Sequence, residues 1–427
     1  MSVVGSLFRR FMGRAPTSAT EPPASAPGVV LHVSSTAQTT PTSGLIIFDV
    51  SPESEIPRSA TLRVIGPGDE GTYERRVEAL PQPAAFWIAV HGHLLDDGPQ
   101  TVRFELIAED GQRLASVPVT VLVSNPGALA ATTRASLRRS GAPFAVEACD
   151  AGDYDYADEA VRPWHEREPA AVQAHLDGLA ARSEATDAEI EVLRHFVEHG
   201  FAVLPDVVGA DLLDRLNGEL DDAAARKVEG YEWGSSQRLH NLHLTYPAIR
   251  EMWAHPRVLR MLSLIFDARP RPYQSLTYIF GSEQHLHQDT VALTPFPAGY
   301  MCGVWTALED VQPDSGELQV YPGSHRGRRV YLKDVGIPKV AEDYTAFGET
   351  IFPIWVDLVS KTPPEVYRPK AGTVLIWHEN LMHAGRVRLD KSLSRRSVVC
   401  HYFADGAIGY HDASGMPGVM SGPPATA

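Results

Sequence analysis

Six short segments between residues 29 and 124 constrain the fold of this chain most strongly. They are rich in β-branched and aromatic residues, and clusters of Pro, Gly and Asp separate them; they cover residues 29–35, 44–50, 60–66, 85–92, 101–109 and 117–124. This composition and spacing predict strands of a small antiparallel β-sandwich. Asp110 and Gly111 lie between the last two segments, where glycine accepts the positive φ of a tight hairpin turn. We therefore expect an immunoglobulin-like β-sandwich over residues 28–125.

The remainder of the chain has a different pattern. A length of 427 residues exceeds the usual size of a single core and favours two domains. Thr186 and Glu189 have capping-box spacing at the start of an amphipathic segment that Gly200 ends. Further helices are expected near Asp211 and from Pro247 to about residue 266. Strand patterns then continue from about 270 to 404, so the second domain is predicted to pack helices on a sheet or barrel.

The segments outside these two regions are predicted to be less ordered. Residues 15–28 are rich in Pro, Ala, Ser and Thr and cannot bury enough apolar surface to offset the entropy of ordering. We expect a disordered tail over residues 1–27, a linker over 126–165, the second domain over 166–410 and a flexible C-terminal tail over 411–427.

Charge and cysteine usage exclude several classes of function. The chain has 38 Lys and Arg against 53 Asp and Glu, a net charge of −15, so it would repel nucleic acid and anionic membranes. No apolar run approaches the roughly 18 residues of a membrane span, so no stable membrane insertion is expected. Its three cysteines are odd in number and far apart, which fits a reducing compartment. We expect a cytoplasmic protein that acts on a small molecule.

The stretch GSEQHLHQDTVALTPFP, residues 281–297, contains the clearest metal-binding pattern. His287 and Asp289 are two residues apart, so in a strand both side chains project from the same face. His285 is also two residues from His287, and spacing alone does not choose between the two pairs.

A third ligand must come from a distant strand. The apolar segment 373–377 leads into a turn that carries His378 and His383, and both are candidates. Two histidines and a carboxylate on one side of a metal leave coordination positions open, as non-haem Fe(II) requires when it binds a chelating cosubstrate and O₂. A structural zinc site would need a fourth protein ligand.

Several motifs in a fixed order resemble those of a known family. They are FVEHGFAVLP, HQD, WTALED, SGELQVYPGSH and a closing HAG followed by RRS, and they fall within residues 186–405. This region resembles the phytanoyl-CoA dioxygenase family of Fe(II)/2-oxoglutarate-dependent oxygenases. The resemblance implies a double-stranded β-helix (jelly-roll) barrel with supporting helices, an α+β fold. It also implies an iron triad of His287, Asp289 and His383, because the family's third ligand precedes a small residue and glycine, here Ala384 and Gly385.

The resemblance further implies 2-oxoglutarate as cosubstrate and O₂ as oxidant. An arginine suits the distal carboxylate of 2-oxoglutarate because its planar fork donates two charge-assisted hydrogen bonds. The family's arginine falls on Arg395, which shares a strand face with Ser397, whereas Arg396 points the other way. A register error of one residue would exchange the two arginines. Gln288 and Trp305 match family positions near the cosubstrate, and a core aromatic is an equal alternative for Trp305.

The reaction implied is hydroxylation of an aliphatic C–H bond, with release of succinate and CO₂. Because the carboxylate of Asp289 is present, halogenation is disfavoured. The substrate is expected to be a small, polar or glycan-like metabolite. Gln274, on a neighbouring strand, and Trp233 and Arg238, in a segment where aromatic and polar residues alternate, are the candidate substrate-binding residues.

Two other classes of protein fit parts of the sequence. One is a metal-dependent, cupin-like enzyme that uses no 2-oxoglutarate and has no need of a buried arginine at position 395. The other is a non-catalytic binding protein in which the β-sandwich does the binding. The sandwich is also a candidate to dock a carrier, a glycan or a second subunit.

Overall fold

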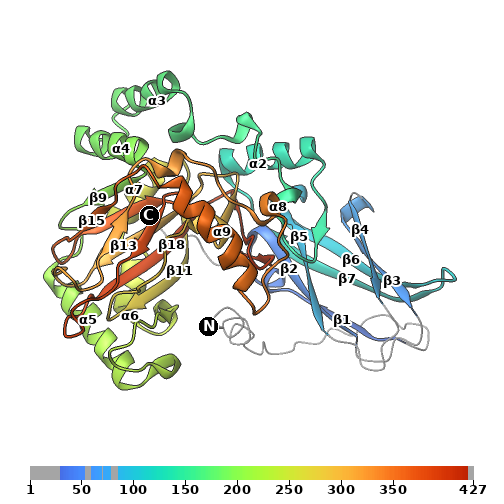
Figure 1. Cartoon of the computed structure of the whole chain (residues 1–427). Helices are drawn as coiled ribbons and strands as arrows, with labels where there is room; N and C mark the ends of the chain where they lie inside the picture. Colours follow the sequence, from blue (N-terminus) through green and yellow to red (C-terminus); the bar gives the residue numbers. More distant parts are fainter. Residues whose placement is uncertain (1–28, 53–58, 70, 78–84, 422–427) are drawn as a thin grey trace.

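The computed structural model describes residues 29–52, 59–69, 71–77 and 85–421. The tail expected to be disordered, residues 1–27, lies outside the described residues. Figure 1 shows a β-sheet domain formed by the first part of the chain beside a larger domain of strands and helices.

The N-terminal domain is the predicted two-layered β-sandwich. Its strands are β1 (Leu31–Ser34), β2 (Thr42–Pro52), β3 (Ala60–Ile65), β4 (Thr72–Val77), β5 (Phe86–His91), β6 (Gly98–Ala108) and β7 (Arg113–Val123). One layer joins β1, β2 and β5, and the other has the order β4-β3-β6-β7. Phe48 and Phe104 face each other across the core with ring centroids 5.0 Å apart. Gly111, with φ of +84°, makes the predicted turn between β6 and β7.

Strand β4 was not among the predicted strands. Its residues alternate between exposed and half-buried, and it carries Arg75 and Arg76. Within the described part of the chain it pairs with β3 alone, at the edge of its layer. An edge strand needs little apolar surface, so its composition gives no strong strand signal.

The second domain is the predicted double-stranded β-helix. Its major sheet has the order β10 (Leu239–His240), β11 (Pro270–Tyr278), β18 (Ser397–Ala404), β13 (Met301–Ala307), β16 (Val374–His378) and β9 (Phe201–Leu204). The minor sheet has the order β15 (Glu365–Tyr367), β14 (Leu318–Val320) and β17 (His383–Gly385). Alternate residues of the major sheet face the minor sheet: Trp305, Trp377 and Val399 pack with Leu318 and Val320.

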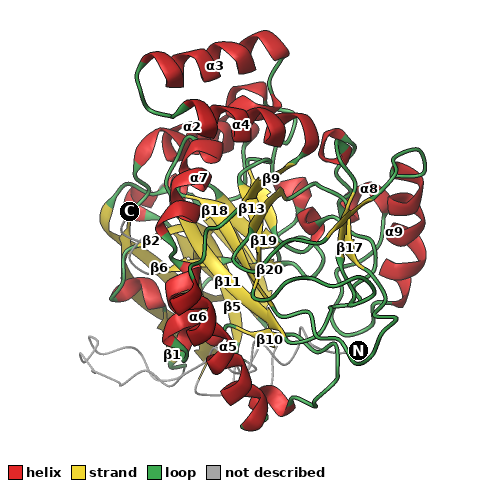
Figure 2. Cartoon of the chain, turned by 90° about the vertical axis from the view of Figure 1, so that its left-hand side faces the viewer, coloured by secondary structure: helices red, strands yellow, loops and turns green. Residues whose placement is uncertain are grey.

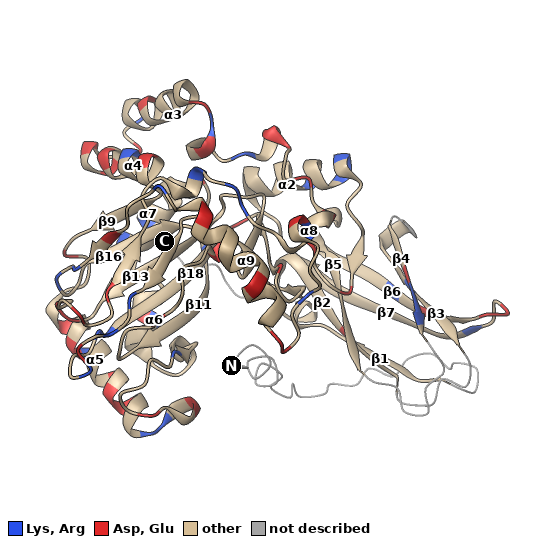
Figure 3. Ribbon diagram, viewed as in Figure 1, with Lys and Arg blue, Asp and Glu red and all other residues tan. Residues whose placement is uncertain are grey.

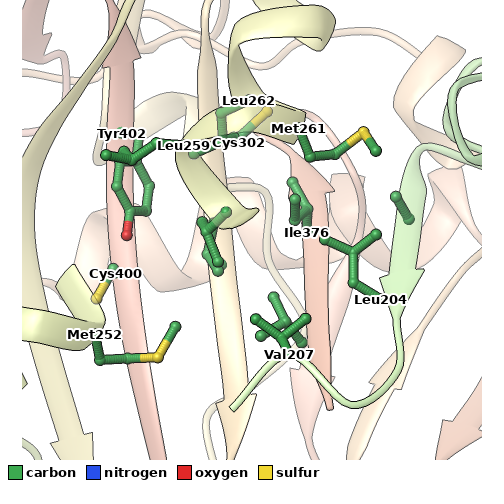
Figure 4. Packing of buried hydrophobic residues seen from close by; sticks show 14 of the residues in the cluster. Leu204, Val207, Met252, Leu259, Met261, Leu262, Cys302, Ile376, Cys400 and Tyr402 are labelled. Atoms are coloured by element: carbon green, nitrogen blue, oxygen red, sulfur yellow. The ribbon is translucent and has the colours of Figure 1, made fainter. Parts of the chain in front are cut away.

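Helices cover the opposite face of the major sheet. They are α4 (Asp187–His199), α5 (Ala210–Ala225), α6 (Pro247–Trp253) and α7 (Pro256–Phe266), and Figure 2 shows α4, α6 and α7 in front of β11, β18 and β13. Figure 4 shows Leu259 and Leu262 of α7 beside Cys302 and Tyr402 of the sheet. Each fully buried leucine of this kind contributes about 1.5–3 kcal/mol. The core between these helices and the major sheet therefore holds the outer face of the sheet. The inner face of the sheet remains available to line the site.

Local signals explain where these helices begin and end. Thr186 and Glu189 form the predicted capping box, and Gly200 ends α4 with φ of +82°. The single helix expected from Pro247 is wrong: the chain forms α6 and then α7, which starts at Pro256. Proline lacks the N–H that a continuous helix requires but fits the first turn of a new one.

Helices also interrupt the strands expected between 270 and 404. They are α8 (Leu332–Val335) and α9 (Thr345–Leu358), and Ile351 and Trp355 of α9 are buried in a small core of their own. Helices α8 and α9 were not predicted from the sequence, and neither was α3 (Pro169–Ala181).

Two segments expected to be irregular are ordered. The region 126–165 contains α2 (Gly127–Ser140) and β8 (Ala145–Val146), which pairs with β5. The C-terminal region contains β19 (Ile408–His411), β20 (Met416–Pro417) and β21 (Val419–Ser421), and β19 pairs with β12 (Thr294–Phe296), while β21 pairs with β2. Both segments are ordered by contacts with residues far away in the sequence. Their local composition therefore did not indicate the helix and strands that they form. Residues 422–427 lie outside the described residues.

Figure 3 shows acidic residues along α4, α5 and α9, in agreement with the net charge of −15. The three cysteines are free and buried. Among the described residues, no helix is both long and apolar enough to cross a membrane.

The contact between α2 and the barrel should depend on a glycine. Gly406 has φ of +100°, and a Cβ at this position would lie 2.5 Å from the backbone nitrogen of Ala130. Its carbonyl also accepts a hydrogen bond from His93 of the sandwich at 2.9 Å. We expect Gly406→Ala to destabilise the protein by about 2 kcal/mol or more, measured as a lowered thermal midpoint. Gly209→Ala is the control, because Gly209 has φ of −74° and open space around it; equal effects would contradict the prediction.

Candidate active site

A cavity of about 400 Å³ lies between the two sheets of the barrel. Its lining combines major-sheet residues, among them Trp305, Trp377 and Arg395, with His383 of the minor sheet. His287 and Asp289, from the loop that follows β11, face the same space. The predicted triad thus lines one cavity.

The three predicted ligands converge. The Nε2 atom of His287 lies 3.6 Å from Oδ1 of Asp289, and Nε2 of His383 lies 3.9 Å from the same oxygen. The two imidazole rings have centroids 4.1 Å apart. This group of His287, Asp289 and His383 has the spacing of a metal site.

Backbone hydrogen bonds bring the two histidines together. The N–H of His287 donates to the carbonyl of His383 at 3.0 Å, and the N–H of His383 donates to the carbonyl of His287 at 3.1 Å. Each ring then uses Nδ1 toward a carbonyl, His287 toward His285 at 2.7 Å and His383 toward Leu381 at 2.9 Å. A donating Nδ1 leaves the lone pair on Nε2, the atom through which such a ring binds a metal. His285 therefore contributes its carbonyl and not its ring.

Asp289 is held as a carboxylate. Its Oδ2 accepts a hydrogen bond from Nε1 of Trp377 at 2.7 Å, and His401 lies 3.7 Å from the same oxygen. Burial raises the pKa of Asp289, but the imidazoles of His383, His401 and His287 outweigh burial and hold the pKa well below its usual range. Burial, followed by the neighbouring His383, lowers the pKa of His287 to about 3, so its ring is neutral. Both groups are in the protonation state that a metal ligand needs.

A glycine makes room for the Trp377 indole. A Cβ at Gly303, on the adjacent strand β13, would lie 2.2 Å from that ring. The absence of a side chain at position 303 therefore permits the hydrogen bond that orients Asp289.

Arg395 lines the same cavity and has no acidic partner in the described chain. It is 2% exposed, its guanidinium lies 5.5 Å from the Trp305 ring, and its Nε has no hydrogen-bond partner there. Burial lowers its pKa to about 10. A buried, unpaired guanidinium is costly unless an anion joins it. Arg396 points outward and pairs with Asp221 of α5 at 2.7 Å, so the cavity receives Arg395 and not its neighbour.

Two further predicted residues lie close to Arg395. Trp305 lines the cavity, and its indole Nε1 has no hydrogen-bond partner among the described residues. Ser397 is fully buried and its hydroxyl is likewise unpartnered there. Ser397 is not among the residues that line the cavity, so the lining offers two such donors, Arg395 and Trp305, to a bound carboxylate.

The structure does not support a cofactor-binding role for Gln288. Its amide donates to the carbonyl of Arg328 at 2.9 Å and accepts from Nε1 of Trp355 at 3.1 Å. Because the residue lies between His287 and Asp289, its side chain points to the opposite side, against α9. Gln288 thus holds the loop that carries His287 and Asp289 on the side opposite the cavity.

The predicted substrate-binding residues divide into two groups. Gln274 lines the cavity with its Nε2 3.1 Å from Nδ1 of His401, and Arg238 lines it with Nη2 3.3 Å from Oε1 of Gln284. Trp233 does not line it: the residue is 67% exposed and packs its ring on Phe280. The alternation of aromatic and polar residues in this segment did not indicate which side chains turn inward.

His401 and Gln284 are site residues that the sequence analysis missed. His401 faces the cavity because it follows Arg395, Ser397 and Val399 at intervals of two along one strand face. Extending that period would have found it. Gln284 contacts Nε2 of His287 at 3.0 Å and follows an irregular loop, so no local signal marked it.

His378, the other candidate third ligand, belongs to a second buried cluster. Its Nε2 lies 2.8 Å from Oε1 of Glu166, and His165 is adjacent. Arg329 pairs with Glu166 and, at 2.9 Å, with Glu379. Because an arginine already neutralises these carboxylates, we interpret this cluster as an ion network that joins residues 165–166 to the barrel.

The donor set of the cavity fits an iron ion with 2-oxoglutarate. Two imidazoles and a carboxylate on one side match the facial arrangement of non-haem Fe(II) sites, and the unpaired donors of Arg395 and Trp305 match a carboxylate. The fold and the site therefore define a jelly-roll protein of the facial-triad class.

Comparisons with known proteins agree with this class. The family profile "Phytanoyl-CoA dioxygenase (PhyH)" matches residues 196–397. A phytanoyl-CoA dioxygenase domain-containing protein 1 of Danio rerio is 36% identical over 91 residues, which are 20% of this chain and 31% of that protein. Phytanoyl-CoA dioxygenase 1 of Oryza sativa subsp. japonica is 31% identical over 169 residues, 38% of this chain and 55% of that protein.

Among solved structures, the non-heme alpha ketoglutarate dependent carbocyclase SnoK from nogalamycin biosynthesis aligns at 17% identity. The alignment covers 54% of this chain and 88% of that one, with a TM-score of 0.43. The family match therefore covers residues 196–397, the part of the chain that contains the three converging ligands. The match to the Danio rerio protein spans about a third of that relative's length.

Metal binding should depend on the convergence of the triad. We expect Asp289→Ala and His383→Ala each to weaken Fe(II) affinity by more than about 100-fold, because loss of a group that merely orients a ligand already costs 10–100-fold. Anaerobic calorimetry and metal analysis would measure the effect. His285→Ala is the matched control, since only its backbone carbonyl contacts the site; similar losses in all three variants would argue against these ligands.

Proposed function

We propose that this protein is an Fe(II)- and 2-oxoglutarate-dependent dioxygenase that hydroxylates an aliphatic C–H bond of a small polar metabolite. Succinate and CO₂ would be the products of the cosubstrate. His287, Asp289 and His383 would hold the iron, while Arg395, Ser397 and Trp305 would hold 2-oxoglutarate.

The observation that carries the proposal is the position of Arg395. A fully enclosed arginine with no acidic partner in the described chain shares one cavity with a three-ligand cluster. A ligand that chelates the metal at one end and presents a carboxylate at the other satisfies both groups at once. 2-Oxoglutarate has this form.

The bound iron would supply activation of O₂ and removal of hydrogen from carbon. The residues of the chain orient the metal ligands and exclude water from the cavity. The Trp377 N–H holds Oδ2 of Asp289, which leaves Oδ1 turned toward both Nε2 atoms. Trp305 and Val399 are buried in the core between the two sheets and line the cavity.

The rest of the lining supports a polar substrate. Arg238 has no carboxylate partner among the described residues, and Gln284, His401 and Gln274 add hydrogen-bonding groups close to the triad. These groups bond one another in part, and a bare hydrocarbon chain would leave their remaining hydrogen-bonding capacity unused, which is costly in a cavity that excludes water.

Turnover of 2-oxoglutarate tests the proposal against the cupin-like alternative. Protein loaded anaerobically with Fe(II) would be given O₂, ascorbate and candidate metabolites, with and without 2-oxoglutarate. Mass spectrometry should detect succinate and a metabolite that gains one oxygen only when 2-oxoglutarate is present. Oxidation that proceeds equally without 2-oxoglutarate would favour the cupin-like alternative.

Adjacent arginines provide a matched pair of variants. We expect Arg395→Ala to raise the dissociation constant of 2-oxoglutarate by about 100-fold, since a buried charge-assisted pair contributes about 2–5 kcal/mol, while Fe(II) binding is retained. Arg396→Ala, which breaks the outward contacts with Asp221 and Asn217 of α5, should leave that constant within about a factor of two, well under the 1.4 kcal/mol of a tenfold change. Calorimetry with Mn(II) as an inert substitute would measure both, and a weaker effect at 395 than at 396 would refute the assignment.

A further inference from the structure

Part of the cavity wall comes from residues beyond the family match, which ends at residue 397. We call residues 408–417 the closing segment. It contains β19 and β20, which pair through Tyr410 and Pro417. The cavity-lining residues that it contributes are His411, Ser414, Met416 and Pro417. The part of the cavity wall formed by the closing segment therefore lies outside the family match, whereas the part that holds the triad lies within it.

The closing segment completes a row of hydrogen-bonding groups. Tyr273 and Nε2 of His411 are joined at 2.8 Å, and Gln274 is joined to His401. Either group can be the donor in the pair of Tyr273 and His411, according to the tautomer of the ring. In both cases the hydroxyl oxygen of Tyr273 keeps a lone pair that can accept a hydrogen bond.

The other residues of this wall also determine which kind of ligand fits against it. The amide oxygen of Gln274 accepts no hydrogen bond within the described chain, so it too offers a lone pair to the cavity. Met416, Pro417 and Leu293 add apolar surface. This combination fits a molecule with N–H or O–H donors beside a hydrocarbon portion.

A single buried carboxylate holds the closing segment in place. Asp412 is fully buried; its Oδ2 accepts from the N–H of Leu332 at 2.7 Å, and its Oδ1 accepts from the N–H of Ala151 at 3.0 Å. Lys339 pairs with the same Oδ1 at 2.8 Å. The carbonyl of Gly415 accepts a further hydrogen bond from the N–H of Cys149 at 2.7 Å. The segment is thus tied to the region 145–153 that follows the sandwich.

The sandwich itself supports the closing segment from behind. Ile408 and Tyr410 pack in one core with Leu45 of β2 and Ala89 of β5. Before the segment, His93 of the sandwich bonds the carbonyl of Gly406. After it, β21 pairs with β2. Both ends of the segment are therefore attached to the N-terminal domain.

We propose that the closing segment selects the substrate, a small metabolite with N–H or O–H donors, and that the β-sandwich serves the oxygenase by holding this segment in position. The inference rests on the proposed function. Tyr273, His411 and Met416 would contact the substrate, and Asp412 is a positioning residue.

The experiment uses the full chain with Fe(II), ascorbate, 2-oxoglutarate and a defined mixture of amino acids, amino sugars and saturated fatty acids. We expect the wild type to oxidise members of the first two classes in preference to the fatty acids. Tyr273→Phe should lower kcat/KM for the oxidised compound by about tenfold or more, mainly through KM, as loss of a hydrogen bond in a closed site does. Met416→Ala should alter the order of preference.

Asp412→Asn tests the positioning role. Hydrogen exchange should accelerate in residues 408–417, and KM should rise, while the dissociation constant of 2-oxoglutarate stays within about a factor of two, which is under 1 kcal/mol. Asp221→Asn is the control, because it breaks a carboxylate–arginine pair on the far side of the major sheet. It should change neither the exchange of the segment nor KM.

Three results would overturn the inference: preferential oxidation of the fatty acids, unchanged preference and KM in Tyr273→Phe and Met416→Ala, or a loss of 2-oxoglutarate affinity in Asp412→Asn as large as its rise in KM. Failure of the proposed function looks different. In that case the wild type would form no succinate with any compound.

Discussion

The paired backbone hydrogen bonds between His287 and His383 are the constraint on which the site depends. The two residues are 96 positions apart (383 − 287), and their mutual N–H to carbonyl bonds fix both α-carbons at the junction of the two sheets. Two local carbonyls then orient the rings, so both Nε2 atoms turn toward Asp289 before any metal arrives. Such preorganisation lowers the entropy cost of assembling the metal site.

The cavity separates opposite charges. Asp289 remains anionic among imidazoles at one end, while Arg395 is a buried cation without a protein counter-ion in the described chain at the other. Burial destabilises each charge unless a ligand of opposite sign joins it. A divalent cation would relieve the penalty at Asp289, and a carboxylate would relieve the penalty at Arg395. The charges that line the cavity and the ligands proposed for it therefore follow from the same electrostatics.

The two domains act as one structural unit around this cavity. Hydrogen bonds and a shared core connect the sandwich to residues 406–421, and the ion network of Glu166, Arg329 and Glu379 connects the preceding region to the barrel. An added domain therefore need not carry chemistry to affect function, because it shapes the wall of another domain's cavity. The expectation that the sandwich docks a carrier, a glycan or a second subunit stays a prediction.

Resemblance to the family, and not spacing alone, selected His287, Asp289 and Arg395 from their neighbours. The sequence by itself determined six of the seven strands β1 to β7 and the capped helix α4. These depend on local periodicity and capping, which a short window of residues contains. Only the tertiary structure decided that Gln288 turns toward α9, that Trp233 stays outside and that residues 408–421 are ordered. The physical reason is that these outcomes arise from pairing and packing between segments far apart in the chain, and their free energy appears only when those segments meet.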